Sequence, residues 1–422
     1  MKFKLFVFGS IFLFESCTSI QKFTKNELGK AEAFKQSITG FSLYDISEKK
    51  TLAAKNEDKF FTPASNTKLF SLYAGLKMLG DSVPALKYIV KNDSLIFWGT
   101  GDPSFLHPDL KSTKAFDFLK NRKEKLFFSA NNNQQPALGD GWTWDDYNEY
   151  YQAEINSFPV YGNIVRFSLV DNQLKASPLK IVDFGAKNNN GFVIRDKNSN
   201  QFSLPNAPLK KNFVQDVPFI TSIQNTISLL ADTLKKPISE INTSIPRSYK
   251  SVYSFHVDSL YKRMMYVSDN MLAEQLILLS SKSDTLSSQK SINNFMKMNL
   301  TDLPDKPRWV DGSGLSRYNL FSPRSIIKLL EKMYTEFPAE RLYKILPASG
   351  QNGTLKNMFK GSEPFIYAKS GSLSNNYNLS GYLIGKSGKT YAFSFMNNHY
   401  MNATSEIKKE VERILTALRR KL

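Results

Sequence analysis

Residues 61–70 read FTPASNTKLF and place Ser65 three residues before Lys68. Apolar residues recur at helical spacing after this stretch, so the pattern predicts a helix over 65–79 with Pro63 in its first turn. A hydroxyl and an amine three residues apart lie on one face of a helix. This arrangement lets a lysine act as the base for a serine nucleophile. The N-terminus of such a helix also favours negative charge on a bound oxyanion.

The Ser-x-x-Lys pattern occurs elsewhere in the chain, so it has little meaning without further motifs. A second motif, Ser268-Asp-Asn270, lies about 200 residues after Ser65, within an apolar run over 256–281. In one unbroken helix, residues two apart are rotated by about 200°, so these two polar side chains would face apart. They share a site only if the helix breaks there. The alternative is two polar residues on a solvated helix face.

A third motif, Lys369-Ser370-Gly371, follows the strand-like run PFIYA at 364–368. In a strand, Lys369 and Gly371 lie on one face, and the missing side chain of Gly371 lets a substrate backbone approach closely. Ser370 points away from that face unless the strand is twisted or lies at an edge. A second Lys-Ser-Gly begins at Lys386, between two strand-like runs, and is typical of a hairpin turn.

The order and spacing of the three motifs resemble those of the class C low-molecular-mass penicillin-binding proteins, which are serine D-Ala-D-Ala carboxypeptidases and endopeptidases. The flanking runs SDNMLAEQL at 268–276, DGSGLSR at 311–317 and KSGSLSN at 369–375 strengthen the resemblance. It implies an α+β fold, in which an antiparallel sheet is flanked by helices. It also implies extra, strand-rich domains inserted between the first and second motifs. Peptidoglycan stem peptides would be the substrates, and β-lactam antibiotics would be covalent inhibitors.

The resemblance also implies a role for each motif residue. Ser65 would be the nucleophile and Lys68 its base, while Ser268 would relay a proton to the leaving amine. Asn270 would hold Lys68 or the substrate amide, and Lys369 with the Ser370 hydroxyl would attract the terminal carboxylate of the substrate. The remaining substrate-binding residues would be Gly371 and Ser372, and the backbone N–H groups of Ser65 and Ser372 would bind the oxyanion.

The base faces an energetic difficulty, because a free lysine has a pKa of about 10.4 and is almost entirely protonated at neutral pH. Burial and a nearby like charge both lower the pKa of an amine. We therefore expect Lys68 to be buried, with Lys369 as the neighbouring positive charge that lowers its pKa.

Composition limits the other classes of function. The chain has 422 residues, a net charge of +18, one cysteine and three histidines. One cysteine excludes an internal disulfide framework, and so few soft ligands argue against a zinc site, so we expect neither metal nor cofactor. Basic charge is compatible with nucleic acid or with an anionic envelope polymer. Since the charge is spread along the chain without a nucleic-acid motif, we expect no nucleic-acid partner.

The N-terminus indicates where the protein acts. Lys2 and Lys4 precede an apolar run over 5–14 that has the length of a signal-peptide core. Cys17, the single cysteine, follows directly and resembles the acceptor of a bacterial lipoprotein signal. The alternative is a cleaved signal with an incidental cysteine. We expect residues 1–16 to be a signal peptide and the mature protein to lie in the periplasm or cell envelope, anchored to the membrane through lipid on Cys17.

Composition along the chain changes from helix-rich to strand-rich and back. We expect a tether and polar helix over 17–39, an inserted strand-rich region over 85–246, and a discontinuous catalytic domain formed by 40–84 and 247–422. Three other functions stay open from sequence. A β-lactamase or an esterase would use the same site, a wall-binding protein would keep the fold without catalysis, and a nucleic-acid binder is the third.

Overall fold

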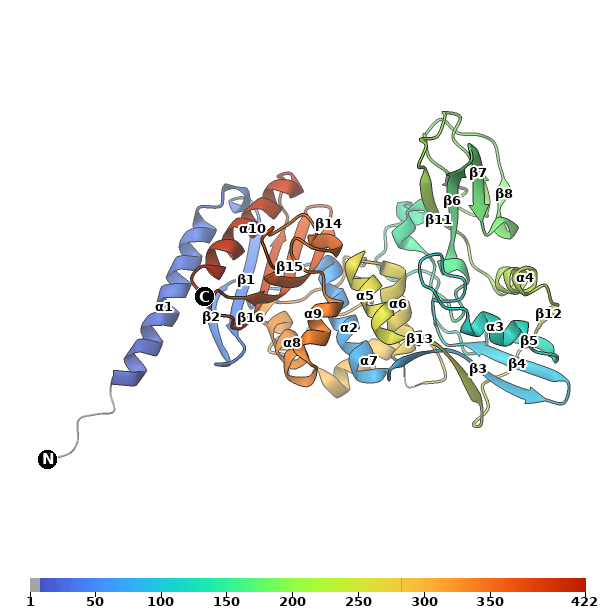
Figure 1. Ribbon diagram of the computed structural model, residues 1–422, viewed down its shortest axis with the longest axis horizontal. Coiled ribbons are helices and arrows are strands. Elements are labelled where there is room, and N and C mark those ends of the chain that lie inside the picture. Colours follow the sequence, from blue (N-terminus) through green and yellow to red (C-terminus); the bar gives the residue numbers. More distant parts are fainter. Residues whose placement is uncertain (1–7, 282) are drawn as a thin grey trace.

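A five-stranded antiparallel sheet, built from both ends of the chain, forms the centre of one half of the molecule (Figure 1). The structure is a computed structural model that describes residues 8–281 and 283–422. The strand order is β14-β15-β16-β1-β2, so strands from the C-terminal half continue the sheet that the N-terminal pair begins. The strands are β1 (Ile38–Asp45), β2 (Lys50–Lys55), β14 (Ile366–Leu373), β15 (Asn376–Ile384) and β16 (Thr390–Asn398).

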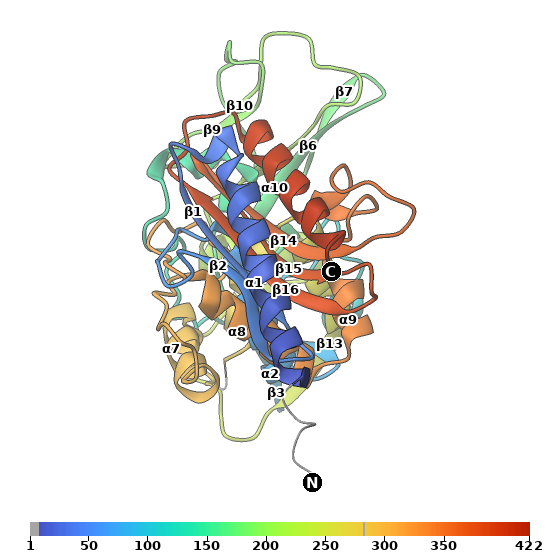
Figure 2. The ribbon, with the colours of Figure 1, turned by 90° about the vertical axis from the view of Figure 1, so that its left-hand side faces the viewer.

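Helices cover both faces of this sheet. One face packs against α1 (Phe8–Gly29) and α10 (Thr404–Arg419), which lie side by side in front of the strands in Figure 2. The other face packs against a helical layer that holds a continuous apolar core. The helices of this layer are α2 (Lys68–Met78), α5 (Val257–Tyr266), α6 (Asn270–Leu279), α7 (Ser288–Asn299), α8 (Pro323–Glu336) and α9 (Ala339–Ile345).

The helix α1 is attached to the edge of the sheet. The Gln21 side chain accepts the Ala54 backbone N–H at 2.8 Å and donates to the Ala54 carbonyl at 3.1 Å, as a neighbouring strand would. Arg413 of α10 pairs with Glu27 of α1. The polar helix expected within 17–39 is wrong at its C-terminal end, because α1 ends at Gly29, a residue that favours helix ends, and β1 begins at Ile38.

The region between α2 and α5 is strand-rich, as expected, and has its own apolar core. A second five-stranded sheet has the order β12-β5-β4-β3-β13, and two three-stranded sheets, β11-β6-β7 and β8-β10-β9, rise beside it (Figure 1). The elements are β3 (Ser82–Lys91), β4 (Ser94–Gly99), α3 (Lys114–Lys120), β5 (Lys125–Ser129), β6 (Ile164–Val170), β7 (Gln173–Ser177), β8 (Asp183–Phe184), β9 (Ile194–Arg195), β10 (Gln201–Ser203), β11 (Val214–Pro218), α4 (Ile223–Leu234), β12 (Ile238–Glu240) and β13 (Lys250–His256).

The fold is therefore α+β, an antiparallel sheet flanked by helices with a strand-rich insertion. The domain boundaries at 85 and 246 stay a prediction. In the structure, the strand-rich region begins with β3 at Ser82 and ends with β13 at His256. The predicted signal segment begins with residues 1–7, outside the described residues, and Cys17 falls within the span of α1. Across residues 8–281 and 283–422, no helix is long and apolar enough to span a bilayer. The same residues hold no cluster of three or more His, Cys, Asp or Glu side chains suited to a metal ion.

Candidate active site

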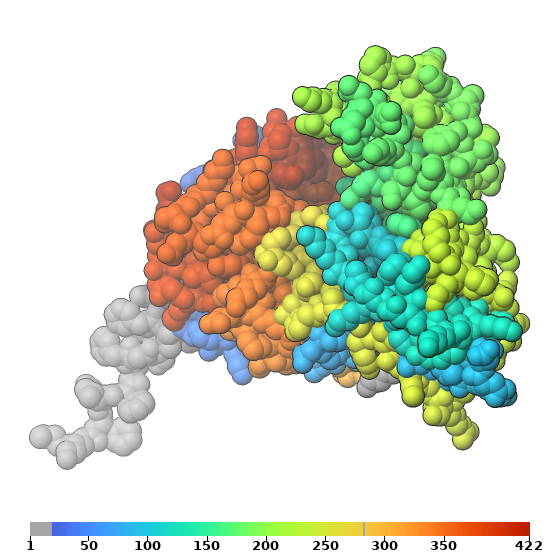
Figure 3. Space-filling view, turned by 45° about the vertical axis from the view of Figure 1, so that its right-hand side comes forward, coloured from blue at the N-terminus to red at the C-terminus, as the bar shows by residue number. Residues whose placement is uncertain are grey.

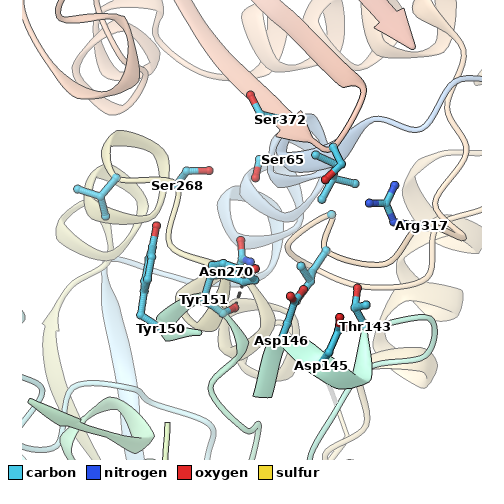
Figure 4. A pocket seen from close by; sticks show the side chains of 15 residues that line it. Ser65, Thr143, Asp145, Asp146, Tyr150, Tyr151, Ser268, Asn270, Arg317 and Ser372 are labelled. Carbon is cyan, nitrogen blue, oxygen red and sulfur yellow. Dashed lines mark hydrogen bonds between the residues drawn. The ribbon is translucent and has the colours of Figure 1, made fainter. Parts of the chain in front are cut away.

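A cleft of about 450 Å³ lies where the β14 edge, the start of α2, the α5–α6 junction and the inserted region meet. In the space-filling view the surface is hollowed between the strand-rich region and the sheet half (Figure 3). Ser65, Ser268 and Ser372 lie on one side of the cleft, and Thr143, Asp145, Asp146, Tyr150 and Tyr151 form the facing wall (Figure 4). The remaining lining residues are Val267, Asn270, Gly314, Leu315, Arg317, Leu373 and Ser374.

Ser65 lies in a tight turn that immediately precedes α2. Residues Ala64–Thr67 form a 3-10 turn, η2, and the α-helix begins at Lys68, so the predicted helix starts three residues later than expected. The Thr67 hydroxyl donates to the Ala64 carbonyl at 2.9 Å, and the Asn66 amide donates to the Ser380 hydroxyl of β15 at 2.8 Å. The turn is thereby tied to the sheet, and Ser65 is presented to the cleft.

Lys68 is fully buried behind Ser65. Its side-chain nitrogen donates to the Ser65 hydroxyl oxygen at 2.9 Å, to the Asn270 amide oxygen at 2.7 Å and to the Ser313 carbonyl at 2.8 Å. Three acceptors match the three N–H groups of an ammonium. When Lys68 is neutral, its lone pair can instead accept the proton of the Ser65 hydroxyl.

Burial lowers the pKa of Lys68 to about 8, against the opposing negative charges of Asp311, Glu274 and Asp269. The expectation of a buried base is confirmed. The expectation that Lys369 lowers the pKa of Lys68 is not, because burial is the main cause. Burial and the charge of Lys68 hold the pKa of Lys369 well below its usual range.

The second motif lies where the helix is interrupted, which is the condition under which Ser268 and Asn270 can share one site. Helix α5 ends at Tyr266 and α6 begins at Asn270. Between them Ser268 has a φ of 60°, a left-handed conformation that interrupts the helical path. The Asp269 carboxylate accepts the Leu272 N–H at 3.0 Å and caps α6. Ser268 therefore faces the cleft while Asn270 reaches Lys68.

The third motif lies on β14, which is an edge strand of the main sheet. Ser372 lines the cleft, whereas Lys369 is fully buried and donates to the Ser370 carbonyl at 2.6 Å. The Ser370 hydroxyl donates to Thr354 at 2.8 Å. Contact of Lys369 and Ser370 with a substrate carboxylate thus stays a prediction.

Gly371 lies against the turn that carries Ser65. A Cβ there would lie 2.5 Å from the Pro63 carbonyl oxygen and 2.9 Å from the Ser65 nitrogen. The missing side chain of Gly371 therefore admits the backbone of the nucleophile's own turn, and contact of Gly371 with a substrate stays a prediction. The same close packing brings β14 against the turn that carries Ser65.

The 311–317 loop contributes groups that sequence reasoning did not assign to the site, although its run DGSGLSR was part of the family resemblance. Ser313 supplies the carbonyl that Lys68 contacts, and Arg317 lines the cleft. Gly314 has a φ of 84°, and a Cβ there would lie 1.9 Å from the Ala64 carbonyl oxygen. The loop is thereby pressed against the turn of Ser65.

The inserted region forms one wall of the cleft, which the sequence did not indicate. The Tyr151 carbonyl accepts the Asn270 amide N–H at 3.1 Å, and the Trp142 indole donates to Asp311 at 3.0 Å. These two bonds tie the inserted region to the α6 start and to the 311–317 loop. A hydroxyl with a buried amine behind it, in a cleft of this size, can carry out acyl transfer.

Comparison with known proteins agrees with this chemistry. The model of the D-Ala-D-Ala carboxypeptidase 3 (S13) family matches residues 24–217 and 232–418. The chain belongs to this family. The S13 family is one of serine peptidases, so the enzymatic class that the motifs indicated is confirmed.

Relatives of this S13 peptidase match over most of their length. The D-alanyl-D-alanine carboxypeptidase DacB of Haemophilus influenzae is 24% identical in an alignment of 438 positions that covers 88% of this chain and 88% of the relative. A D-alanyl-D-alanine carboxypeptidase of an Actinomadura species is 24% identical over 87% of this chain and 78% of its own. The crystal structure of penicillin-binding protein 4 from H. influenzae superposes with a TM-score of 0.75 at 19% identity, covering 94% of this S13 peptidase and 99% of that chain.

Proposed function

We propose that this S13 peptidase hydrolyses the terminal D-Ala-D-Ala bond of peptidoglycan stem peptides through an acyl-enzyme on Ser65. The observation that carries the proposal is the 2.9 Å contact between the Lys68 nitrogen and the Ser65 hydroxyl in a cleft of about 450 Å³. The family, and the activity named for its relatives in H. influenzae and Actinomadura, support the substrate class.

Acylation begins when the Ser65 oxygen attacks the carbonyl carbon of the scissile bond. The hydroxyl proton passes to the neutral nitrogen of Lys68, and the backbone N–H groups of Ser65 and Ser372 stabilise the oxyanion. The C–N bond then breaks, and the departing D-Ala nitrogen takes a proton from the Ser268 hydroxyl, which Lys68 replenishes. Water later attacks the ester carbonyl and returns Ser65 to its free form.

Penicillins acylate the same serine in this proposal, because opening the lactam ring forms the same ester. A structure of H. influenzae penicillin-binding protein 4 complexed with a β-lactam has the same fold, with a TM-score of 0.70. The lactam amine stays attached to the acyl group after ring opening, so it remains in the cleft and hinders the hydrolytic water. Penicillin is then a covalent inhibitor.

The direct test is release of D-alanine from a synthetic pentapeptide ending in D-Ala-D-Ala, with wild type beside Ser65→Ala. We expect free D-alanine from wild type and none above background from the variant. Rapid turnover of penicillin without release of D-alanine would indicate a β-lactamase, and a stable protein without either reaction would indicate a wall-binding protein. Either result would contradict the proposal.

We also propose that the protein is exported and held at the membrane by lipid on Cys17. The charge pattern of residues 1–17 supports this, as does the position of Gln21, four residues later, whose side chain attaches α1 to the sheet edge. Cys17→Ser should move the protein from the membrane fraction to the soluble periplasmic fraction. An unchanged distribution would contradict the lipid anchor and leave export itself untouched.

A further inference from the structure

The third acceptor that the Lys68 nitrogen contacts is the Ser313 carbonyl. Because this is a backbone group, its position depends on the contacts that hold the 311–317 loop. Ser313 itself is fully buried, and its neighbour Gly312 packs against α6 so closely that a Cβ there would lie 2.5 Å from the Ala273 carbonyl oxygen. The loop therefore has no room to shift towards the helix. Its hydrogen-bond partners decide how it is oriented towards Lys68.

Glu274 of α6 provides two of these partners. One of its carboxylate oxygens accepts the Gly312 N–H at 2.9 Å, and the other accepts the Ser313 N–H at 2.8 Å. The side chain is 1% exposed and is not among the residues that line the cleft. Two donors facing both oxygens match a carboxylate, and they fix the two peptide planes on either side of Gly312, which lead directly into Ser313. The plane that carries the Ser313 carbonyl is held in addition by the Gly314 N–H, which donates to the Asp311 carboxylate at 2.8 Å.

The spacing along α6 explains why one helix can orient two acceptors of the same amine. Asn270 and Glu274 are four residues apart and share a helix face. Asn270 contacts Lys68 directly at 2.7 Å, and Glu274 acts one step further away, through the Ser313 peptide. From the other side, the Ser71 hydroxyl of α2 donates to the Gly312 carbonyl at 2.5 Å.

Charge adds a second effect. The charged groups that face Lys68 are Lys369 from β14, Asp311 from the loop, and Asp269 and Glu274 from the start and second turn of α6. Burial and the charge of Asp311 raise the pKa of Glu274 itself to about 8, so its negative charge favours the Lys68 ammonium only as the pH rises through that range. The Ser313 carbonyl favours the ammonium as an acceptor. Loss of either would make Lys68 easier to deprotonate.

We propose that Glu274 is a positioning residue for the acylation step, which holds the Ser313 carbonyl against the nitrogen of Lys68. The inference rests on the proposed acylation of Ser65. Glu274→Gln tests it, because the amide presents a donor to one of the two N–H groups that the carboxylate accepts. The turn then loses a bond while the volume of the side chain is kept.

The measurement is the rate constant and final stoichiometry of labelling by a fluorescent penicillin, as a function of its concentration and of pH between about 5 and 10. In Glu274→Gln we expect the maximum rate constant to fall by about 10- to 100-fold, since small displacements of reacting groups have effects of this size. The half-saturating concentration should stay within about twofold, because Glu274 does not line the cleft. The acidic limb of the pH profile should move to lower pH.

Two variants give the comparison. Glu274→Asp keeps the charge but is one methylene shorter, so the acidic limb should return towards its wild-type position while the maximum rate stays reduced. Glu412→Gln is the matched control, because the Glu412 carboxylate accepts the Phe359 N–H at 2.6 Å on the distant helix α10. Its rate constant and acidic limb should equal those of wild type.

The outcomes separate this inference from the proposed function. An unlabelled wild type contradicts the proposed function. A labelled wild type beside a Glu274→Gln variant with unchanged rate constant and limb contradicts the positioning role, as does a lower stoichiometry with an unchanged rate constant. If Glu274→Gln does not fold, Ser71→Ala removes the other hold on the same turn, and an unchanged maximum rate there would overturn the inference.

Discussion

The Lys68 side-chain nitrogen lies 2.7 Å from the Asn270 amide oxygen, although 202 residues separate the two along the chain. The contact exists because the helix is interrupted at Ser268, which turns Asn270 towards α2. The same nitrogen lies 2.9 Å from the Ser65 hydroxyl. One buried amine thus joins the first and second motifs, and its protonation state determines whether Ser65 can react.

The first prediction concerns pH. Because the pKa of Lys68 is lowered to about 8 and the base must be neutral, the rate of acylation by penicillin should rise as pH increases through about 8 and then level off. Lys68→Arg stays protonated throughout this range and should lower the plateau rate by about 10²- to 10⁴-fold. Stopped-flow or quenched labelling across the pH range measures both. A rate independent of pH would rule out Lys68 as the titrating base.

The second prediction concerns the lysine pair. Burial, and not the charge of Lys369, lowers the pKa of Lys68, so replacing Lys369 should leave the acidic limb in place. We expect Lys369→Gln to lower the maximum rate, because the bond to the Ser370 carbonyl is lost, without moving the limb. Lys386→Gln is the matched control from the second Lys-Ser-Gly, which forms the exposed β15–β16 turn. A limb that moves to higher pH in Lys369→Gln would show that its charge does act on Lys68.

The third prediction concerns the contact between β14 and the nucleophile turn. Gly371→Ala places a Cβ within 3 Å of backbone atoms of Pro63, Asn66 and Ser65. We expect the free energy of unfolding to fall by about 1–3 kcal/mol, as in other overpacked sites, and acylation to slow because Ser65 is displaced. Gly80→Ala is the control, since a Cβ at Gly80 meets no atom within 4 Å. Equal stability and rates in the two variants would contradict the packing argument.

The fourth prediction concerns the cap of α6. Asp269→Ala removes the acceptor of the Leu272 N–H and should lower the free energy of unfolding by about 0.5–2 kcal/mol. Acylation should slow as well, because Ser268 and Asn270 flank the cap. Ser222→Ala removes the corresponding cap of α4 in the inserted region. It should lower the free energy of unfolding by a similar amount without slowing acylation. Thermal unfolding and labelling rates measure the two effects, and an unchanged rate in Asp269→Ala would separate the cap from catalysis.

Much of the site could be predicted because the chemistry constrains local sequence. A hydroxyl and an amine three residues apart at the start of an apolar helix indicated Ser65 and Lys68, and the requirement for a helix break at Ser268 followed from helical geometry alone. The hairpin at Lys386 followed from turn composition. The family resemblance then supplied the fold and the order of the motifs.

The parts that sequence could not supply depend on which surfaces meet. Gly371 was assigned to the substrate because nothing local shows that β14 packs on the turn of Ser65. Two other features also depend on tertiary packing. Lys369 is buried, and the inserted region forms one wall of the cleft. The Ser313 contact uses a backbone carbonyl, and any residue type carries one, so its position leaves no mark in the sequence.

The central claim is that Ser65 becomes acylated with Lys68 as its base. Its most direct measurement is mass spectrometry of the intact protein and of its peptides after incubation with penicillin. We predict one added penicillin per chain, mapped to Ser65, with no adduct in Ser65→Ala that unfolds at the same temperature as wild type. An adduct of equal stoichiometry in Ser65→Ala, or one mapped to a different residue in wild type, would contradict the account.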